Sequence, residues 1–159
     1  MLNRILFWMS LLCFLLTPLS IAAMESDGVE MAVDLTKVGE QAKRHKVPIM
    51  IFFAAVDCGY CERLEADYLH AMANSAKYKK RVIIRKVVID GYDNLRDFTG
   101  KVISSADIAN DYNIDLTPTL VMVNHAGTSI GRNIVGYTKS GFFGASLDNA
   151  IDSAAKKLR

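Results

Sequence analysis

The sequence predicts an α/β fold, a three-layer sandwich in which a mixed four-stranded sheet carries helices on both faces. Three observations predict it. Helical and strand patterns alternate along the chain, two long apolar runs are typical of buried strands, and a short turn separates the last two strand patterns. Strands joined through helices pair in parallel, whereas a hairpin is antiparallel, so the predicted sheet is mixed.

The first 23 residues, MLNRILFWMSLLCFLLTPLSIAA, have the pattern of a secretory signal peptide. Arg4 provides the positive end, residues 5–16 form an apolar core, and two alanines close the segment before the expected cleavage site. The apolar run is shorter than the roughly 20 residues of a membrane-spanning helix, and a proline interrupts it. We therefore expect a cleaved signal peptide and export to the periplasm, with residues 24–159 forming one domain; the alternative is an uncleaved inner-membrane anchor.

The composition excludes several classes of protein. A chain of 159 residues with 51% hydrophobic and 23% charged residues is neither disordered nor long enough for two ordinary domains. A net charge of +2 without a basic stripe argues against a nucleic-acid partner. Three cysteines are too few for a disulfide scaffold or a four-thiolate zinc site, and only Cys58 and Cys61 remain after the signal peptide.

The first helix is expected after a short polar lead over residues 24–33. Asp34 is a favourable N-cap for a helix that continues to about Lys46, with its apolar residues on one side. Pro48 then opens a strand over residues 47–55. Because this strand is apolar on both faces, it is predicted to be central and buried.

The second helix is expected from about Tyr60 to Asn74, where apolar residues recur at helical spacing. Its predicted inner face consists of Cys61, Leu64, Tyr68, Ala71 and Met72. Residues 82–90 (VIIRKVVID) predict a second central strand. Residues 91–104 have no strong periodicity and are expected to form a loop.

The last third of the chain predicts a helix, a hairpin and a final helix. The third predicted helix covers residues 105–113. The hairpin joins a strand over residues 119–124 to a partner strand over residues 129–136. Residues 137–158 end in a helix whose apolar residues are Phe142, Phe143, Leu147, Ile151 and Ala155.

The tetrad Cys58-Gly59-Tyr60-Cys61 stands where a buried strand ends and a helix begins. Unpaired N–H groups and the helix dipole favour an anion at this end, so a Cys58 thiolate is stabilised and nucleophilic. Cys61 lies one turn later, within disulfide reach and more shielded. This arrangement predicts that Cys58 attacks a substrate disulfide and that Cys61 resolves the mixed disulfide.

A purely structural disulfide and a metal site are the competing interpretations of the tetrad. A structural disulfide is disfavoured because this loop encloses only Gly59 and Tyr60, and chain-entropy stabilisation grows with loop length. A metal site is disfavoured because none of the three histidines stands at ligand spacing from the cysteines: His45, His70 and His125. We expect no metal and no cofactor.

The tripeptide Thr117-Pro118-Thr119 is the second signal, because it directly precedes an apolar strand. A proline at this position is a candidate for the cis isomer. It would place backbone beside Cys58 without an N–H in the way, and the main chain of Thr117 would be able to pair with a substrate strand.

Together these segments resemble the thioredoxin superfamily, and within it the exported SoxW-like thioredoxins, over roughly residues 34–157. The resemblance is carried by IMIFFAAVDCGYC with the helix after it, RKVVID, the excursion with DFTGK, and the run from DIANDYNIDLTPTLVMVNHAG to VGYTKSGFF. It implies a thioredoxin-like fold and a dithiol–disulfide oxidoreductase with Cys58 as nucleophile, Cys61 as resolving thiol and Pro118 as cis-proline. The CGYC tetrad with threonine before the proline is also similar to the active site of the disulfide isomerase DsbC.

The sequence departs from this family's cytosolic members at two positions. They carry a buried aspartate six residues before the first cysteine and a tryptophan directly before it, where this chain has Phe52 and Asp57. A carboxylate beside a thiolate opposes ionisation, so Asp57 is expected to offset part of the helix effect. Lys86 aligns with a lysine near the family's resolving thiol; a proton or charge partner and a strand-edge lysine that reaches solvent both stay open.

The leading hypothesis is an exported oxidoreductase that exchanges disulfides with protein substrates, with a membrane thiol-disulfide reductase or oxidant as redox partner. DsbC-type isomerases carry a dimerisation domain before the catalytic one, whereas only about ten residues precede the first helix of the mature chain here. We therefore expect a monomeric reductase rather than an isomerase. The alternative from another class is a non-catalytic thioredoxin-fold module that binds a partner or carries a metal.

The signal-peptide interpretation predicts a mature N-terminus near Met24, because cleavage follows the small residues that end the segment. Intact-mass spectrometry of the protein from its native cell measures this directly. A chain that begins at Met1 and is found in the membrane fraction would favour the anchor instead.

Overall fold

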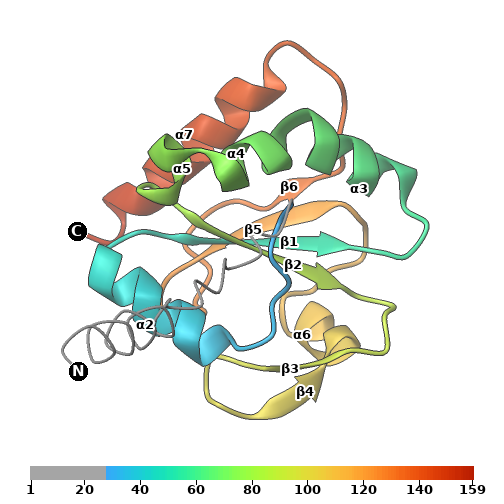
Figure 1. The fold of residues 1–159 in the computed structure, drawn as a ribbon, viewed down its shortest axis with the longest axis vertical. Coiled ribbons are helices and arrows are strands. Elements are labelled where there is room, and N and C mark those ends of the chain that lie inside the picture. The colour runs from blue at the N-terminus through green and yellow to red at the C-terminus, as the bar shows by residue number, and fades with distance from the viewer. Residues whose placement is uncertain (1–27) are drawn as a thin grey trace, which may run out of the picture.

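The computed structural model describes residues 28–159, which form the predicted α/β sandwich (Figure 1). The main sheet has four strands in the order β2-β1-β5-β6: β1 Ile49–Ala54, β2 Ile83–Val88, β5 Thr119–Val123 and β6 Ile134–Val135. β2 runs parallel to β1, β5 runs antiparallel to β1, and β6 runs antiparallel to β5. The predicted mixed four-stranded sheet is therefore confirmed, while the predicted signal peptide lies outside the described residues.

Helices cover both faces of this sheet (Figure 1). One face carries α2, Leu35–His45, and α6, Ser105–Asp111. The other face carries α7, Phe143–Lys156, and a long helical segment made of α3 Gly59–Leu64, η2 Glu65–Leu69, α4 His70–Asn74 and α5 Ala76–Lys79. The two faces bury separate apolar clusters, because the side chains of a strand alternate between them.

Strand β1 is central, as the sequence predicts. All six of its residues are buried. Met50, Phe52 and Ala54 face the cluster under α3 and α7, while Ile49, Ile51 and Phe53 face the cluster over α2 and α6. A strand buried in this way requires apolar residues at every position, which explains its continuous apolarity.

Asp34 caps α2, as predicted. Its Oδ1 accepts hydrogen bonds from the backbone N–H groups of Thr36 and Lys37, at 3.1 and 3.3 Å. These bonds satisfy two donors that the first turn of a helix leaves unpaired.

The second helix is less regular than its sequence pattern predicts. Between α3 and α4, residues Glu65–Leu69 form a π-helical segment, whose wider turns accommodate an extra residue. The inward face shifts as a result: Leu69 and Met72 are buried, whereas Ala71, predicted to point inward, is exposed. A prediction that assumes 3.6 residues per turn throughout misses this shift.

The prediction that residues 82–90 form a second central strand is wrong, because β2 is an edge strand of the four-stranded sheet. The expected polar lead covers part of this edge. The N–H of Lys86 donates to the carbonyl of Glu30 at 2.9 Å, and the N–H of Ala32 donates to the carbonyl of Lys86 at 2.8 Å. Because backbone groups make this contact, it does not require a regular pattern of apolar residues in the lead, although Val29 and Ala32 are buried.

The expected loop over residues 91–104 also contains structure. Strands β3, Asn94–Arg96, and β4, Val102–Ser104, form a two-stranded antiparallel sheet. Leu95 pairs with Ile103, and both are buried against the α2–α6 side of the core. Strands of three residues are too short to produce a detectable period in the sequence.

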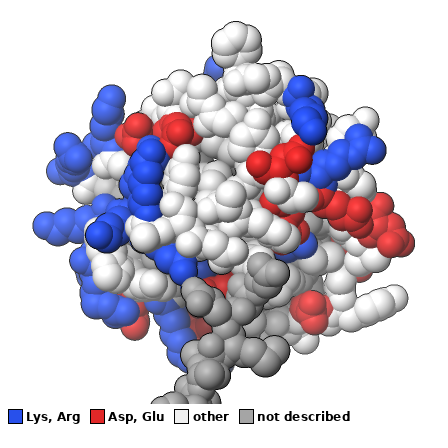
Figure 2. All heavy atoms as spheres, turned by 45° about the horizontal axis from the view of Figure 1, so that its top comes forward, with Lys and Arg blue, Asp and Glu red and all other residues white. Residues whose placement is uncertain are grey.

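Basic side chains gather at the end of the molecule away from α3. The last turns of α2, α5 and α7 carry Lys43, Arg44, His45, Lys77, Lys79 and Lys156. Figure 2 shows Lys and Arg concentrated on its left side, where α5 and the end of α7 lie in Figure 1. Cations at helix C-termini are favoured by the helix dipole, so a local helix effect accounts for this grouping.

Gly39 allows α2 to approach the turn after β5 closely. A Cβ atom at this position would lie only 2.3 Å from the carbonyl oxygen of His125. Glycine in a helix costs about 1 kcal/mol relative to alanine, so this close contact accounts for a residue that helix propensity disfavours.

We expect Gly39→Ala to lower the free energy of unfolding by about 1–3 kcal/mol, because backbone at His125 must move to admit the methyl group. Urea denaturation followed by circular dichroism measures the change. Lys43→Ala on the exposed side of the same helix is the control and should stay within about 0.5 kcal/mol of the wild type. Equal or greater stability of Gly39→Ala would contradict the close packing.

Candidate active site

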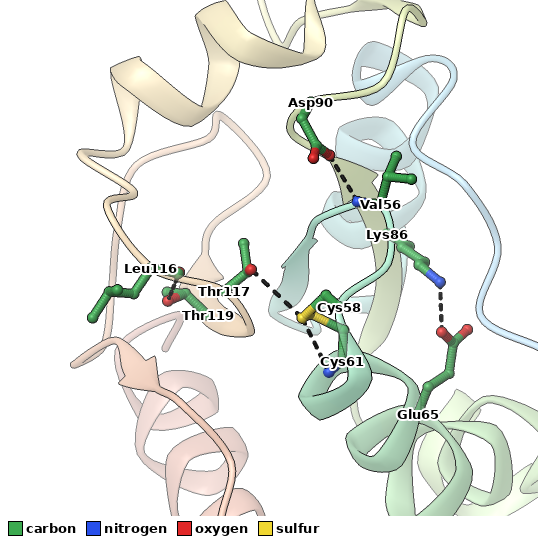
Figure 3. Close-up of a disulfide and its surroundings, with 9 residues drawn as sticks. All are labelled: Val56, Cys58, Cys61, Glu65, Lys86, Asp90, Leu116, Thr117 and Thr119. Carbon is green, nitrogen blue, oxygen red and sulfur yellow. Dashed lines mark hydrogen bonds and ion pairs between the residues drawn. A yellow bond between two sulfur atoms is a disulfide. The ribbon is translucent and has the colours of Figure 1, made fainter.

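Cys58 and Cys61 form a disulfide at the N-terminus of α3 (Figure 3). Their sulfur atoms are bonded, and their Cα atoms lie 5.2 Å apart. β1 ends at Ala54, and a short loop leads from there into α3. The tetrad therefore stands between a buried strand and a helix N-terminus, as its sequence context predicts.

Cys58 is the N-cap residue of α3. Its carbonyl accepts hydrogen bonds from the N–H groups of Cys61 and Glu62, at 2.9 and 3.1 Å. The N–H of Cys61 also lies 3.2 Å from the Cys58 sulfur and donates to it. This donor and the helix dipole both favour a negative charge on the sulfur once the disulfide is opened.

The two cysteines differ in accessibility. Cys58 is half-buried, whereas Cys61 is only 3% exposed and belongs to the apolar cluster under α3. An incoming molecule therefore meets the sulfur of Cys58 first. This difference supports the predicted division between an attacking and a resolving thiol, which stays a prediction.

The Thr117–Pro118 peptide bond is cis and lies beside the disulfide, as the sequence predicts. The hydroxyl of Thr117 donates to the Cys58 sulfur at 3.6 Å. The hydroxyl of Thr119 donates to the carbonyl of Leu116 at 2.7 Å, which holds the loop in place before β5 begins. Figure 3 shows this loop facing the disulfide across a short gap.

A shallow pocket of about 330 Å³ lies between Tyr60 of the tetrad and the Pro118 loop. It is lined by Tyr60, Thr117, Pro118, Val135, Gly136, Tyr137, Thr138 and Phe143. Two of these residues are largely exposed: the aromatic Tyr60 at 60% and the apolar Val135 at 56%. Exposed aromatic and apolar groups therefore lie beside the tetrad and the Pro118 loop.

Asp57 stands directly before the tetrad with a φ of 54°, in the left-handed region that aspartate and asparagine tolerate better than most residues. Its side chain is exposed, and its carboxylate makes no hydrogen bond or ion pair with any described residue. The cap of α3 is Cys58 rather than Asp57. Any influence of Asp57 on the cysteines is therefore electrostatic.

Asp90 is a site residue that the sequence reasoning did not single out. Its Oδ1 accepts a hydrogen bond from the N–H of Val56 at 2.8 Å. The bond ties the loop before Cys58 to the chain directly after β2 (Figure 3). Its only sequence signal is an acidic residue at the end of a strand parallel to β1.

Lys86 is partly buried and paired, so it is not a lysine that extends freely into solvent. Its Nζ lies 2.5 Å from Oε2 of Glu65, and the two side chains are 24% and 14% exposed. The sequence reasoning left Lys86 open between a charge partner and a solvent-exposed lysine, and it missed Glu65. The available signal was the position of Glu65 one helical turn after Cys61.

Within residues 28–159, no group of three or more His, Cys, Asp or Glu side chains is arranged to hold a metal ion. His70 instead lies beside Glu65, with its Nε2 at 3.5 Å from Oε1. In that same part of the chain, no helix combines the length and the apolar content needed to cross a membrane.

Comparison with known proteins gives a consistent result. A family model described as a thioredoxin-like domain matches residues 35–151. The fold is similar to that of a thioredoxin from Malassezia sympodialis, with a TM-score of 0.54, 20% identity and coverage of 80% of this chain and 94% of that one. It is also similar to oxidised mitochondrial thioredoxin 3 from Saccharomyces cerevisiae, with a TM-score of 0.52, 22% identity and coverage of 78% and 93%. Among curated proteins, none matches the sequence.

We expect Asp57→Asn to lower the pKa of the Cys58 thiol by about one pH unit or less, because the substitution removes a negative charge beside the thiolate. Asparagine also tolerates the left-handed backbone, so the loop should keep its shape. The thiolate absorbance of the reduced protein at about 240 nm, followed against pH, measures the change. Asp152→Asn, in the C-terminal half of α7, removes the same charge far along the chain from the tetrad and is the control for net charge. An unchanged or higher pKa of the Cys58 thiol in Asp57→Asn would exclude the electrostatic role.

Proposed function

Because this chain belongs to the thioredoxin-like family, we propose that it is an exported thiol-disulfide oxidoreductase that acts on protein substrates through Cys58 and Cys61. One observation carries the proposal. A disulfide stands at a helix N-terminus, its more accessible sulfur belongs to Cys58, and the loop of Thr117 and Pro118 faces it. A structural disulfide would gain little from enclosing two residues, whereas thiol chemistry needs an accessible and stabilised sulfur.

The proposed reaction starts from the dithiol form. The Cys58 thiolate attacks one sulfur of a substrate disulfide, a bond forms between Cys58 and that sulfur, and the other substrate sulfur leaves as a thiolate that takes up a proton. Cys61 then loses its proton and attacks the Cys58 sulfur, which releases the second substrate thiol. The substrate gains two electrons, and the protein ends with the Cys58–Cys61 disulfide seen in the structure.

The site offers an extended substrate both backbone and apolar contacts. The main-chain N–H and C=O of Thr117 make no hydrogen bond within the described part of the chain. They are therefore available to pair with an extended segment that carries the substrate disulfide. Tyr60 and Val135 would cover apolar side chains on either side of it.

We further propose that the protein works in the periplasm as a monomeric reductase, with a membrane thiol-disulfide reductase returning it to the dithiol form. The signal-peptide pattern of residues 1–23 supports the location. Isomerisation and oxidation would use the same two cysteines, and the reduction potential of the pair distinguishes them. The narrower likeness to SoxW-like proteins or to DsbC stays a prediction.

We expect Cys61→Ser to accumulate mixed disulfides with client proteins, because the resolving thiol is absent, and Cys58→Ser to accumulate few. Non-reducing electrophoresis of each variant, purified from its native compartment after alkylation, measures the trapped species. The Cys58→Ser, Cys61→Ser double variant gives the background.

Two results would contradict this proposal. Equal trapping by both single variants would contradict the assignment of Cys58 as nucleophile. If no variant trapped a client and the wild-type protein failed to reduce a disulfide substrate, the oxidoreductase function itself would be excluded. A metal bound in proportion to the protein and lost with either cysteine would then favour a carrier module.

A further inference from the structure

We propose that Arg63 and Lys139 bind a carboxylate of the substrate, so that the protein prefers disulfides carried by acidic extended segments. This inference rests on the proposed function, since it names the class of substrate for the same two cysteines. The site is a pocket of about 400 Å³ beside the tetrad. Its lining consists of Tyr60, Arg63, Asp67, Tyr137, Thr138 and Lys139.

The pocket continues the surface that lies beside the Pro118 loop. Tyr60, Tyr137 and Thr138 line both this pocket and the one along that loop. Tyr60 is also the tetrad residue directly before Cys61, and it is 60% exposed. A substrate segment that is held at the Pro118 loop and continues past Tyr60 therefore enters the second pocket.

Arg63 presents to this pocket a guanidinium that is not paired with any described acid. Its central carbon lies 5.5 Å from the centre of the Tyr60 ring, one helical turn earlier. Arg63 makes no hydrogen bond or ion pair within residues 28–159, so its five N–H donors are open to a ligand. Stacking on the ring restricts the guanidinium to a narrow range of positions, which lowers the entropy cost of binding a carboxylate.

The acid that shares a helix face with Arg63 is already engaged elsewhere. Asp67 follows Arg63 by four residues, a spacing at which opposite charges usually pair. Instead, Asp67 Oδ2 accepts a hydrogen bond from the Tyr137 hydroxyl at 2.6 Å, and Lys139 Nζ lies 4.0 Å from the same oxygen. The hydrogen bond to Asp67, with burial, raises the pKa of Tyr137 to about 12, so this hydroxyl stays protonated at neutral pH and keeps donating.

The charges of the lining favour an anion. Two cations, Arg63 and Lys139, and one anion, Asp67, line the pocket, so its net charge is positive. The Lys139 side chain is 85% exposed and adds mainly a general attraction, whereas Arg63 supplies directed hydrogen bonds. Asp57 and Glu62 stand close in the sequence but do not line the pocket. Asp and Glu side chains are the anions that an unmodified protein segment offers.

The helix geometry indicates where the acidic residue of the substrate should stand. Four helical steps separate Gly59, the first residue of α3, from Arg63, which is a rise of about 6 Å. An extended segment covers this distance with about two residues. We therefore expect the acidic residue two or three positions from the substrate cysteine.

The test uses the reduced mature chain and disulfide-linked dimers of a short blocked peptide that contains one cysteine. Glutamate, glutamine or lysine is placed two or three positions before or after that cysteine. The released peptide thiol gives the second-order rate constant at low ionic strength, and reaction of the same peptides with dithiothreitol corrects for the intrinsic effect of each charge. We expect the best glutamate peptide to react roughly two- to fivefold faster than its glutamine counterpart, a preference that falls as salt is added.

Variants of the pocket identify the groups responsible. Arg63→Gln should remove most of the preference for glutamate, and Lys139→Gln should weaken it less. Arg63→Glu should reverse it, so that the lysine peptide reacts fastest. Asp67→Asn still accepts from the Tyr137 hydroxyl but removes a repelling charge, so the preference should increase. Arg44→Gln, on the exposed side of α2, removes the same charge as Arg63→Gln and should keep the wild-type preference.

Equal corrected rates for the glutamate and glutamine peptides with the wild type, or a preference that Arg63→Glu does not reverse, would overturn the inference. Circular dichroism checks the fold of each variant, and Arg63→Gln decides the question if Arg63→Glu does not fold. If the wild-type protein reduces the peptides without regard to their charge, only this inference fails. If it reduces none of them, the proposed function fails as well.

Discussion

The burial of β1 on both faces is the constraint on which the active site depends. β2 and β5 flank this strand, so its C-terminal end is fixed in the middle of the sheet, and the loop after Ala54 delivers Cys58 to the start of α3. The same pairing places the Pro118 loop. Thr119 stands opposite Phe53, so the cis bond just before Thr119 comes next to the cysteines. The two parts of the site meet because their strands are neighbours.

The charge environment of the two cysteines has one contribution from the backbone of α3 and others from charged side chains. The N-terminus of α3 favours negative charge at Cys58 whatever the surrounding side chains are. Asp57 is exposed and is expected to oppose that charge from the loop, while the Glu65–Lys86 pair lies on the inner side, where water screens charges less. The basic residues at the ends of α2, α5 and α7 lie away from this region.

The position of Phe52 links the departure from the cytosolic pattern to the structure. A phenyl ring replaces a carboxylate in the middle of β1, where an unpaired charge would be costly. Lys86 stands opposite Phe52 in the strand register, and its counter-ion is Glu65, the first residue of the π-helical segment. The extra residue of that segment also changes which side chains of the helix point inward.

Local patterns in the amino-acid sequence were sufficient for the α/β class, the buried strand β1, the Asp34 cap and the tetrad at a helix start, because each depends on neighbouring residues. They also made Pro118 a candidate for the cis isomer, and the family resemblance implied it. They did not reveal the edge position of β2, the β3–β4 sheet or the phase shift at Leu69. The partner of Lys86 was equally hidden, because Glu65 stands 21 residues earlier and only the packing of α3 and η2 over β2 brings the two charges together. Periodicity reports which face of an element is apolar, whereas contacts between distant elements arise only when the chain has folded.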